Sequence, residues 1–222
     1  VIGMGNVAID ILRVLGKTKA EMATSDLTAH AADRIAAAPL TDLYMLGRRG
    51  PIEASFTSAE LAELGKLERV RPIVKKSDLP DAIPTGLDPN EARVKEKNLS
   101  ILHDFADRTD EKPIRLHFLF NAAPEAIVGS ERVEGLNIKN GPTLEVGTVI
   151  SAIGYRTAAD GDLPQSDERG VIANKDGRIE TGLYVVGWAK RGPSGTIPTK
   201  PGERMTVADL LPATQLTVLG IL

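Results

Sequence analysis

The first ten residues read Val1-Ile2-Gly3-Met4-Gly5-Asn6-Val7-Ala8-Ile9-Asp10. The pattern predicts the tail of a buried strand, a glycine turn and the first turns of a helix, and it matches the G-x-G-x-x-A form of the dinucleotide-binding fingerprint. In that form Gly3 permits the tight turn, Gly5 lets a pyrophosphate approach the backbone, and Ala8 lets helix and strand pack closely. The helix N-terminus then offers free N–H groups to phosphate.

The chain begins inside this motif. Only two residues precede Gly3, and the first residue is not Met. We therefore expect the sequence to be a piece of a longer protein, whose other part holds some of the chemistry.

Helical and strand patterns alternate after the fingerprint. Helices are expected over residues 9–15, 27–38, 57–67, about 91–107 and, at the C-terminus, about 205–219. Strands are expected over 42–46, 114–120, 146–153 and 183–186, with a hairpin around Asn140-Gly141 and a surface excursion over 71–91. This alternation favours an α/β fold with a parallel sheet.

Composition excludes several classes of protein. The 222 residues carry a net charge of −3, which gives no reason to expect nucleic acid as a partner, and they include no cysteine. Disulfides and cysteine-held clusters are thus excluded within this chain. No apolar run has the length of a membrane span. His30, His103 and His117 are scattered without metal-ligand spacing, so we interpret them as surface or structural residues and expect no metal site.

A basic pair follows the second predicted strand. In NAD-binding domains an acidic residue at this position bonds the ribose 2′-hydroxyl, but here the strand ends in Arg48-Arg49. Two guanidinium groups attract a 2′-phosphate and bond it with several donors, which favours NADP over NAD. The alternative is a solvated basic turn without a ligand.

Glu60 has two interpretations. Thr57 and Glu60 form a T-x-x-E capping box, in which Glu60 bonds a backbone N–H and has no further role. Alternatively, Glu60 meets a ribose hydroxyl or an arginine close to the nucleotide. The residues alone favour the cap.

A third candidate element runs from Gly187-Trp188 through a loop rich in glycine. A buried strand followed by a tryptophan and such a loop suits a flat ligand, because glycines let backbone amides approach it. The alternative is a structural turn covered by the only tryptophan of the chain.

Five motifs in this order, between Val1 and about Thr199, resemble the adrenodoxin-reductase type of ferredoxin–NADP reductase. They are Gly3-x-Gly5-Asn6-Val7-Ala8, Gly47-Arg48-Arg49-Gly50-Pro51, Phe56-Thr57-x-x-Glu60-Leu61, Ile153-Gly154-Tyr155-Arg156 and Gly187-Trp188-Ala189-Lys190-Arg191-Gly192-Pro193-Ser194-Gly195-Thr196-Ile197. The resemblance implies a Rossmann-like three-layer NADP-binding domain over 1–150, followed over 151–222 by the returning segment of a FAD-binding domain. The N-terminal FAD motif of that family is absent from this chain, and residues 200–222 follow the family poorly.

The resemblance also implies the site residues. NADP would be bound by Met4, Gly5, Asn6, Val7, Arg48, Arg49, Glu60 and Gly195, and FAD by Trp188, Gly195, Thr196 and Ile197. Glu63 resembles a family carboxylate near the nicotinamide and is the one candidate for a catalytic role. Met4 replaces a residue that is commonly polar, so a side-chain contact to phosphate is lost there. For Glu60 the resemblance reverses the preference for a cap.

The function implied is that of an NADPH-dependent flavoprotein oxidoreductase. Hydride would pass from NADPH to FAD, and single electrons would pass on to a ferredoxin-type iron–sulfur protein. The expected location is the bacterial cytoplasm or an organelle. Two alternatives stay open: an NADP-binding module without catalysis of its own, and another two-dinucleotide flavoprotein such as a glutamate synthase small subunit. The latter usually ends its last strand in Gly-Asp, whereas this chain has Gly187-Trp188.

Overall fold

The computed structural model describes residues 1–154, 170–192 and 217–219. It divides into two compact units, Val1–Ile153 and Gly154–Leu222. The roles expected for the two parts, NADP binding and FAD binding, stay predictions.

A parallel sheet lies at the centre of the first unit. It is formed by β1 (Asp42–Leu46), β2 (Val70–Ile73) and β3 (Ile114–Leu119) in the order β1-β3-β2. Ile2 extends this sheet, because it bridges in parallel to Leu46 on one side and to Ser151 on the other. The fingerprint therefore follows directly from a strand position beside β1.

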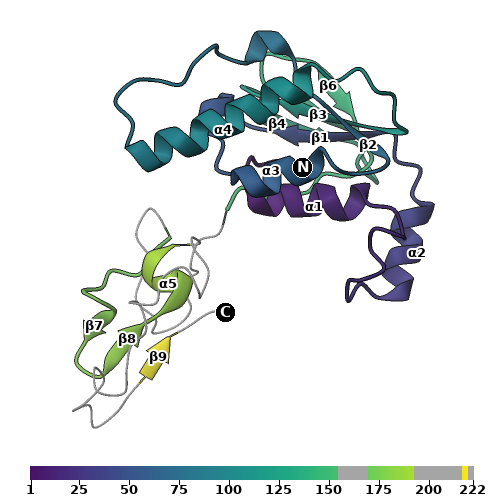
Figure 1. Ribbon diagram of the computed structural model, residues 1–222. Coiled ribbons are helices and arrows are strands. Elements are labelled where there is room, and N and C mark those ends of the chain that lie inside the picture. Colours follow the sequence, from purple (N-terminus) through teal and green to yellow (C-terminus); the bar gives the residue numbers. More distant parts are fainter. Residues whose placement is uncertain (155–169, 193–216, 220–222) are drawn as a thin grey trace. The chain divides into compact units, whose positions relative to one another are not determined.

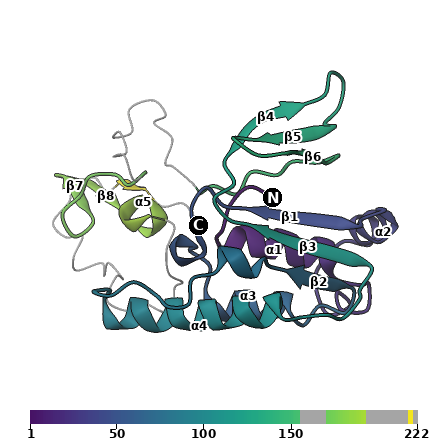
Figure 2. The ribbon, with the colours of Figure 1, turned by 90° about the horizontal axis from the view of Figure 1, so that it is seen from above.

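Three layers make up this unit (Figures 1 and 2). One face of the parallel sheet is covered by α1 (Asn6–Gly16), α3 (Ser58–Leu64) and α4 (Pro89–Ala106). On the other side lies an antiparallel sheet of β4 (Pro124–Val128), β5 (Gly135–Ile138) and β6 (Thr143–Glu145). The remaining elements of the unit are α2 (Ala29–Ala37) and two short 3₁₀ turns, η1 (Pro51–Glu53) and η2 (Lys76–Asp78).

The alternation of residues along the parallel strands produces these layers, because successive side chains point to opposite faces. Leu43 and Met45 of β1 join the core shared with the helices, together with Phe118 of β3. Leu46 joins the second core between the two sheets, where it packs with Leu136 of β5 and its neighbours. An α/β fold with a parallel sheet is thus confirmed.

The second unit is small in the part that the structure describes. In it β7 (Arg178–Glu180) pairs antiparallel with β8 (Leu183–Val185), and β8 pairs parallel with β9 (Thr217–Leu219). A short helix, α5 (Gly187–Arg191), follows β8. Ile172, Val185 and Ala189 form its core.

Several elements differ from those expected. Strand β2 lies at the start of the region predicted as a surface excursion. Pro72 hides this strand in the sequence, because proline is disfavoured in central strands; β2 is the edge strand, where proline is tolerated. Strand β4 was not expected at all.

The elements expected near the C-terminal end of each unit also differ from those observed. The strand expected over 146–153 reduces to a bridge at Ser151, and the side chain of Ile153 is 72% exposed instead of buried. The first residues of the loop expected after Gly187 form helix α5, and the rest of that loop, from Pro193 to Ile197, lies outside the described residues. Of the expected C-terminal helix, residues 217–219 form strand β9 instead, and 205–216 lie outside the described residues.

Where the structure describes the chain, it contains no helix of the length and hydrophobicity that would cross a membrane.

Candidate functional site

Three segments meet at the carboxyl edge of the parallel sheet: the fingerprint turn 3–6, the basic turn 47–50 after β1, and the segment 55–60 that leads into α3. The Ser55 N–H donates to the carbonyl oxygen of Met4 at 2.8 Å. The Thr57 N–H donates to Oδ1 of Asn6, also at 2.8 Å. These bonds fix the entry into α3 against the first turn of α1.

The two fingerprint glycines are required for different reasons. Gly3 has a φ of +139°, and a Cβ there would lie 2.2 Å from the carbonyl oxygen of Ala152, so a side chain is excluded by both conformation and space. Gly5 is the N-cap of α1 and has no side chain that could accept from the helix N-terminus. The first N–H groups of α1 therefore have no capping side chain, which is the arrangement that binds anions.

Met4 fills the space between the fingerprint and the basic turn. A Cβ on Gly47 would lie 2.6 Å from Cγ of Met4, so the methionine packs directly on this glycine. Met4 also packs against the core under the helices. The apolar side chain of Met4 thus supports the basic turn from the side of the fingerprint.

Arg48 and Arg49 are exposed at the end of β1. Among the described residues neither guanidinium has a hydrogen-bond or ion-pair partner. Their backbone, in contrast, is fixed: the Asn121 N–H donates to the carbonyl oxygen of Arg49 at 3.0 Å, and the Gly47 N–H donates to that of Leu119 at 2.9 Å. The turn thus presents two unpaired cations on a rigid support.

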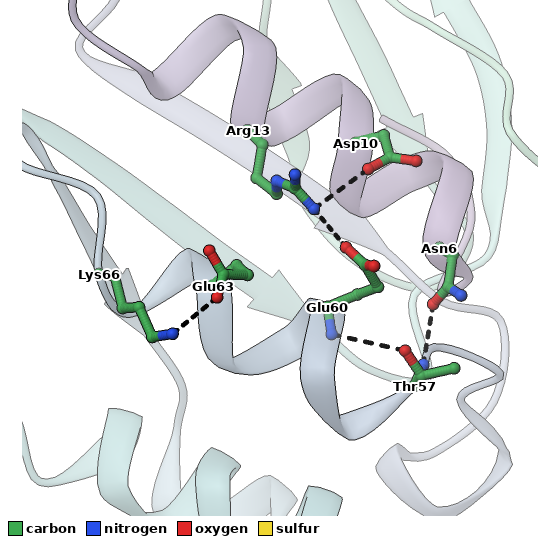
Figure 3. Close-up of polar contacts among 7 residues, drawn as sticks. All are labelled: Asn6, Asp10, Arg13, Thr57, Glu60, Glu63 and Lys66. Carbon is green, nitrogen blue, oxygen red and sulfur yellow. Dashed lines mark hydrogen bonds and ion pairs between the residues drawn. The ribbon is translucent and has the colours of Figure 1, made fainter. Parts of the chain in front are cut away.

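Glu60 makes contacts that the capping box does not describe (Figure 3). One half of the box is present, since the Thr57 hydroxyl accepts from the Glu60 N–H at 3.4 Å. The other half is wrong, because the Thr57 N–H is donated to Asn6 and the carboxylate of Glu60 forms an ion pair with Arg13 of α1. Arg13 also lies 3.4 Å from the carboxylate of Asp10. Glu60 is therefore tied to an arginine of the fingerprint helix.

Glu63 lies one turn further along α3 and is paired with Lys66 at 2.7 Å (Figure 3). The hydrogen bond from the lysine lowers the pKa of the Glu63 carboxyl. Its side chain is 43% exposed, so it is accessible to a ligand. The lowered pKa means that the Glu63 carboxylate is ionised at neutral pH.

Sequence reasoning missed Arg13 as a site residue. The signal available was the spacing of Asp10 and Arg13, since residues three apart are neighbours on a helix surface. The partner on α3 could not be read from that spacing.

Another cluster of polar side chains lies at the opposite end of β1. Asp42 accepts from Nε and Nη2 of Arg115 at 2.8 and 2.6 Å, and its Oδ1 lies 2.7 Å from Nε2 of His117. The Arg115 bond is the largest cause that lowers the pKa of Asp42 to about 2. His117 also stacks on Tyr44, with ring centroids 4.8 Å apart. This histidine is engaged within the fold.

The side chains of the predicted flavin-binding residues lie outside what the structure describes. Trp188 lies in α5, of which only the backbone is described at this position. Gly195, Thr196 and Ile197 lie outside the described residues, as do Tyr155 and Arg156. Their roles stay predictions.

Known proteins resemble this chain closely over half of their length. The NADPH-ferredoxin reductase FprA of Mycobacterium tuberculosis is 32% identical over 95% of the chain and 51% of its own length. The mitochondrial NADPH:adrenodoxin oxidoreductase of Arabidopsis thaliana is 30% identical over 90% of the chain and 49% of its own length. No family model matches.

Solved structures support the same relationship. The structure of M. tuberculosis FprA in complex with NADPH superposes with a TM-score of 0.80 at 31% identity, covering 91% of this chain and 49% of that one. Sequence and fold therefore agree, and the chain spans about half the length of the relatives it matches. The resemblance to the adrenodoxin-reductase type of ferredoxin–NADP reductase is confirmed, and the chain is a homologue of these reductases over that half.

Proposed function

We propose that the first unit, Val1–Ile153, is the NADP(H)-binding domain, of Rossmann type, of a reductase. The observation that carries the proposal is the unpaired pair Arg48 and Arg49, which is held beside a helix N-terminus without a capping side chain. Dinucleotides bind at this carboxyl edge of parallel sheets, where the first strand runs into the first helix.

The residues present fit NADP in two ways. The pyrophosphate is anionic, and the first turn of α1 supplies backbone N–H groups and partial positive charge at Asn6 and Val7, with no Cβ at Gly5 to block the approach. The 2′-phosphate distinguishes NADP from NAD, and two guanidinium groups without partners in the described residues suit it. Glu60, tied to the fingerprint helix through Arg13, is proposed to contact the same nucleotide.

The whole protein is proposed to be an NADPH-dependent flavoprotein oxidoreductase. When bound, NADPH and FAD would supply hydride transfer and one-electron chemistry. The names of the relatives, NADPH-ferredoxin reductase and NADPH:adrenodoxin oxidoreductase, support a ferredoxin-type iron–sulfur protein as acceptor. The FAD contacts proposed at Trp188, Gly195, Thr196 and Ile197 rest on the sequence motif. A cytoplasmic or organellar location follows from the same relationship.

Calorimetric titration of the 222-residue chain with NADP and with NAD tests the nucleotide site. The expected result is binding of NADP that is tighter than that of NAD by roughly two to four orders of magnitude, the contribution of two charge-assisted contacts. Equal affinity for the two nucleotides, or no binding of either, would remove the basis for the site.

A second measurement separates a flavoprotein from a nucleotide-binding module. A chain that retains flavin absorbs at about 450 nm, as the oxidised isoalloxazine does. NADP binding without this absorbance, even after FAD is added, would mean that these 222 residues by themselves act as a nucleotide-binding module.

A further inference from the structure

The carboxylate of Glu60 lies close to the site proposed for a polyanionic ligand. The proposed nucleotide carries a pyrophosphate and a 2′-phosphate, yet Glu60 lies on α3 next to α1, and its side chain is 36% exposed. An isolated carboxylate at this position would repel the phosphates. Its charge must be balanced if it is to help binding.

Arg13 supplies the balance (Figure 3). It projects from α1 two turns beyond Asn6, and its Nη1 atom forms an ion pair with Oε2 of Glu60. Only 25% of the Arg13 side chain is exposed, and its Nε atom is buried without a hydrogen-bond partner among the described residues. The guanidinium is thus directed toward Glu60 and away from solvent.

The neighbouring contacts hold this pair in place. Ala8, Ile9 and Leu12 of α1 and Leu61 and Leu64 of α3 belong to one buried core, so the two helices are packed together. The bond from the Thr57 N–H to Asn6 ties the start of α3 to the first turn of α1. Arg13 and Glu60 therefore meet at a seam that begins at the fingerprint.

We propose that Arg13 is a positioning residue for the nucleotide: it neutralises Glu60 and directs its carboxylate, so that the Oε1 atom accepts from a hydroxyl of the nucleotide without repelling the phosphates. The inference rests on the proposed NADP site. Without Arg13 the cluster of Asp10, Arg13 and Glu60 changes its net charge from −1 to −2, and Glu60 becomes an uncompensated anion beside the ligand.

The test is calorimetric titration with NADP of four chains: the unchanged one, Arg13→Gln, Arg13→Gln combined with Glu60→Gln, and the control Lys19→Gln. Lys19 pairs with Asp33 on the surface, and both side chains are mostly exposed, so its loss removes an ion pair outside the site. Thermal unfolding followed by circular dichroism verifies that each variant is folded. An Arg13→Lys variant, which keeps the charge, replaces Arg13→Gln if the latter does not fold.

The expected loss of NADP affinity in Arg13→Gln is about tenfold at low salt, the order of effect of one uncompensated charge at a partly exposed site. Because salt screens this repulsion, the loss relative to the unchanged chain shrinks at about 0.5 M KCl. The second change, Glu60→Gln, removes the repulsion and restores affinity to within about threefold of the unchanged chain. Where Arg13→Lys has to be used, the cluster keeps its net charge of −1, so NADP affinity should stay within about threefold of the unchanged chain, and a tenfold loss would overturn the inference.

A loss in Arg13→Gln that is the same at high salt and is not restored by Glu60→Gln would overturn the inference, since it would assign Arg13 to helix packing alone. Unchanged affinity in Arg13→Gln would overturn it as well. If the unchanged chain does not bind NADP, the proposed function fails and the inference with it, a result distinct from both of the others.

Discussion

The turn from Gly3 to Asn6 and the turn from Gly47 to Gly50 follow neighbouring parallel strands, yet they differ in what surrounds their residues. In the first, the backbone of Gly3 lies against Ala152, and the side chain of Asn6 accepts from the Thr57 N–H. In the second, the backbone is equally fixed, but the guanidinium groups of Arg48 and Arg49 have no partner in the described part of the chain.

The difference separates two kinds of site residue. The fingerprint turn uses its residues to build the fold, so a change that removes one of their contacts lowers stability. The basic turn holds side chains that the fold does not use, so changes there affect ligand binding alone. The following changes distinguish these two kinds of role.

The largest effect is expected for the double change Arg48→Ala and Arg49→Ala. Removing both cations lowers NADP affinity by roughly two to four orders of magnitude, because two charge-assisted contacts to the 2′-phosphate are lost. NAD, which lacks this phosphate, should bind as it does to the unchanged chain. Calorimetric titration measures both affinities, and a melting temperature equal to that of the unchanged chain is expected. A large drop in stability would contradict the comparison, because it would show that the fold uses these side chains.

Gly3→Ala tests the fingerprint turn through the stability of the fold, where the arginine variant is tested through ligand binding. The new Cβ meets the backbone oxygen of Ala152 and requires an unfavourable φ, so we expect the free energy of unfolding to fall by about 2–4 kcal/mol. Gly86→Ala is the matched control: Gly86 also has a positive φ, of +86°, but nothing lies within 4 Å of its Cβ, so about 1 kcal/mol is expected. Urea denaturation measures both. Equal losses in the two variants would rule out the close approach as the reason for glycine at position 3.

The elements carried by local patterns could be predicted from the sequence. The fingerprint, β1 and α4 were expected nearly where they lie, because glycine turns, apolar alternation and helical periodicity are local signals. Strand β2 was missed because Pro72 disfavours a strand, and only the sheet order reveals that β2 lies at the edge. The bridge at Ser151 replaces a full strand for reasons that no local pattern contains.

The site shows the same limit. That Arg48 and Arg49 lie exposed at the end of a strand could be predicted from their position in the sequence, and their role as ligands of a 2′-phosphate stays a prediction. The ion pair between Arg13 and Glu60 could not, because the two residues are 47 positions apart and meet only when α1 packs on α3. The capping box predicts one of the two contacts correctly, since Thr57 caps α3. It does not predict that the Thr57 N–H donates to Asn6.

Asn6→Asp sharpens the comparison within the fingerprint turn. Aspartate keeps an oxygen for the Thr57 N–H and places a negative charge at the start of α1, where the helix dipole favours it. Stability should therefore stay the same or rise slightly. NADP affinity should fall about tenfold, because the new charge lies where the phosphates are proposed to bind. Thermal unfolding and calorimetry on the same sample measure both, and undiminished affinity would argue that phosphate binds elsewhere.

The smallest effect concerns Arg115, an arginine that the fold does use. It pairs with Asp42, whose pKa is lowered from 3.8 to about 2 chiefly by this bond. A carboxyl with a lowered pKa in the folded state adds stability that is complete above its unfolded pKa and is lost as the pH falls through its folded pKa. We expect about 1 kcal/mol to be lost between about pH 5 and about pH 2, since solvent screens part of the interaction.

Asp42→Asn should remove this part of the pH dependence, so that the unfolding free energies of the two chains converge at low pH. The control is Asp107→Asn, whose partner Lys76 and own side chain are both mostly exposed, and it should change the curve less. NMR titration of the Asp42 carboxyl gives its pKa directly. A value near that of a free aspartate would mean that the Asp42–Arg115 pair is loose in solution, and pairing within the fold would then not distinguish Arg115 from the free arginines of the basic turn.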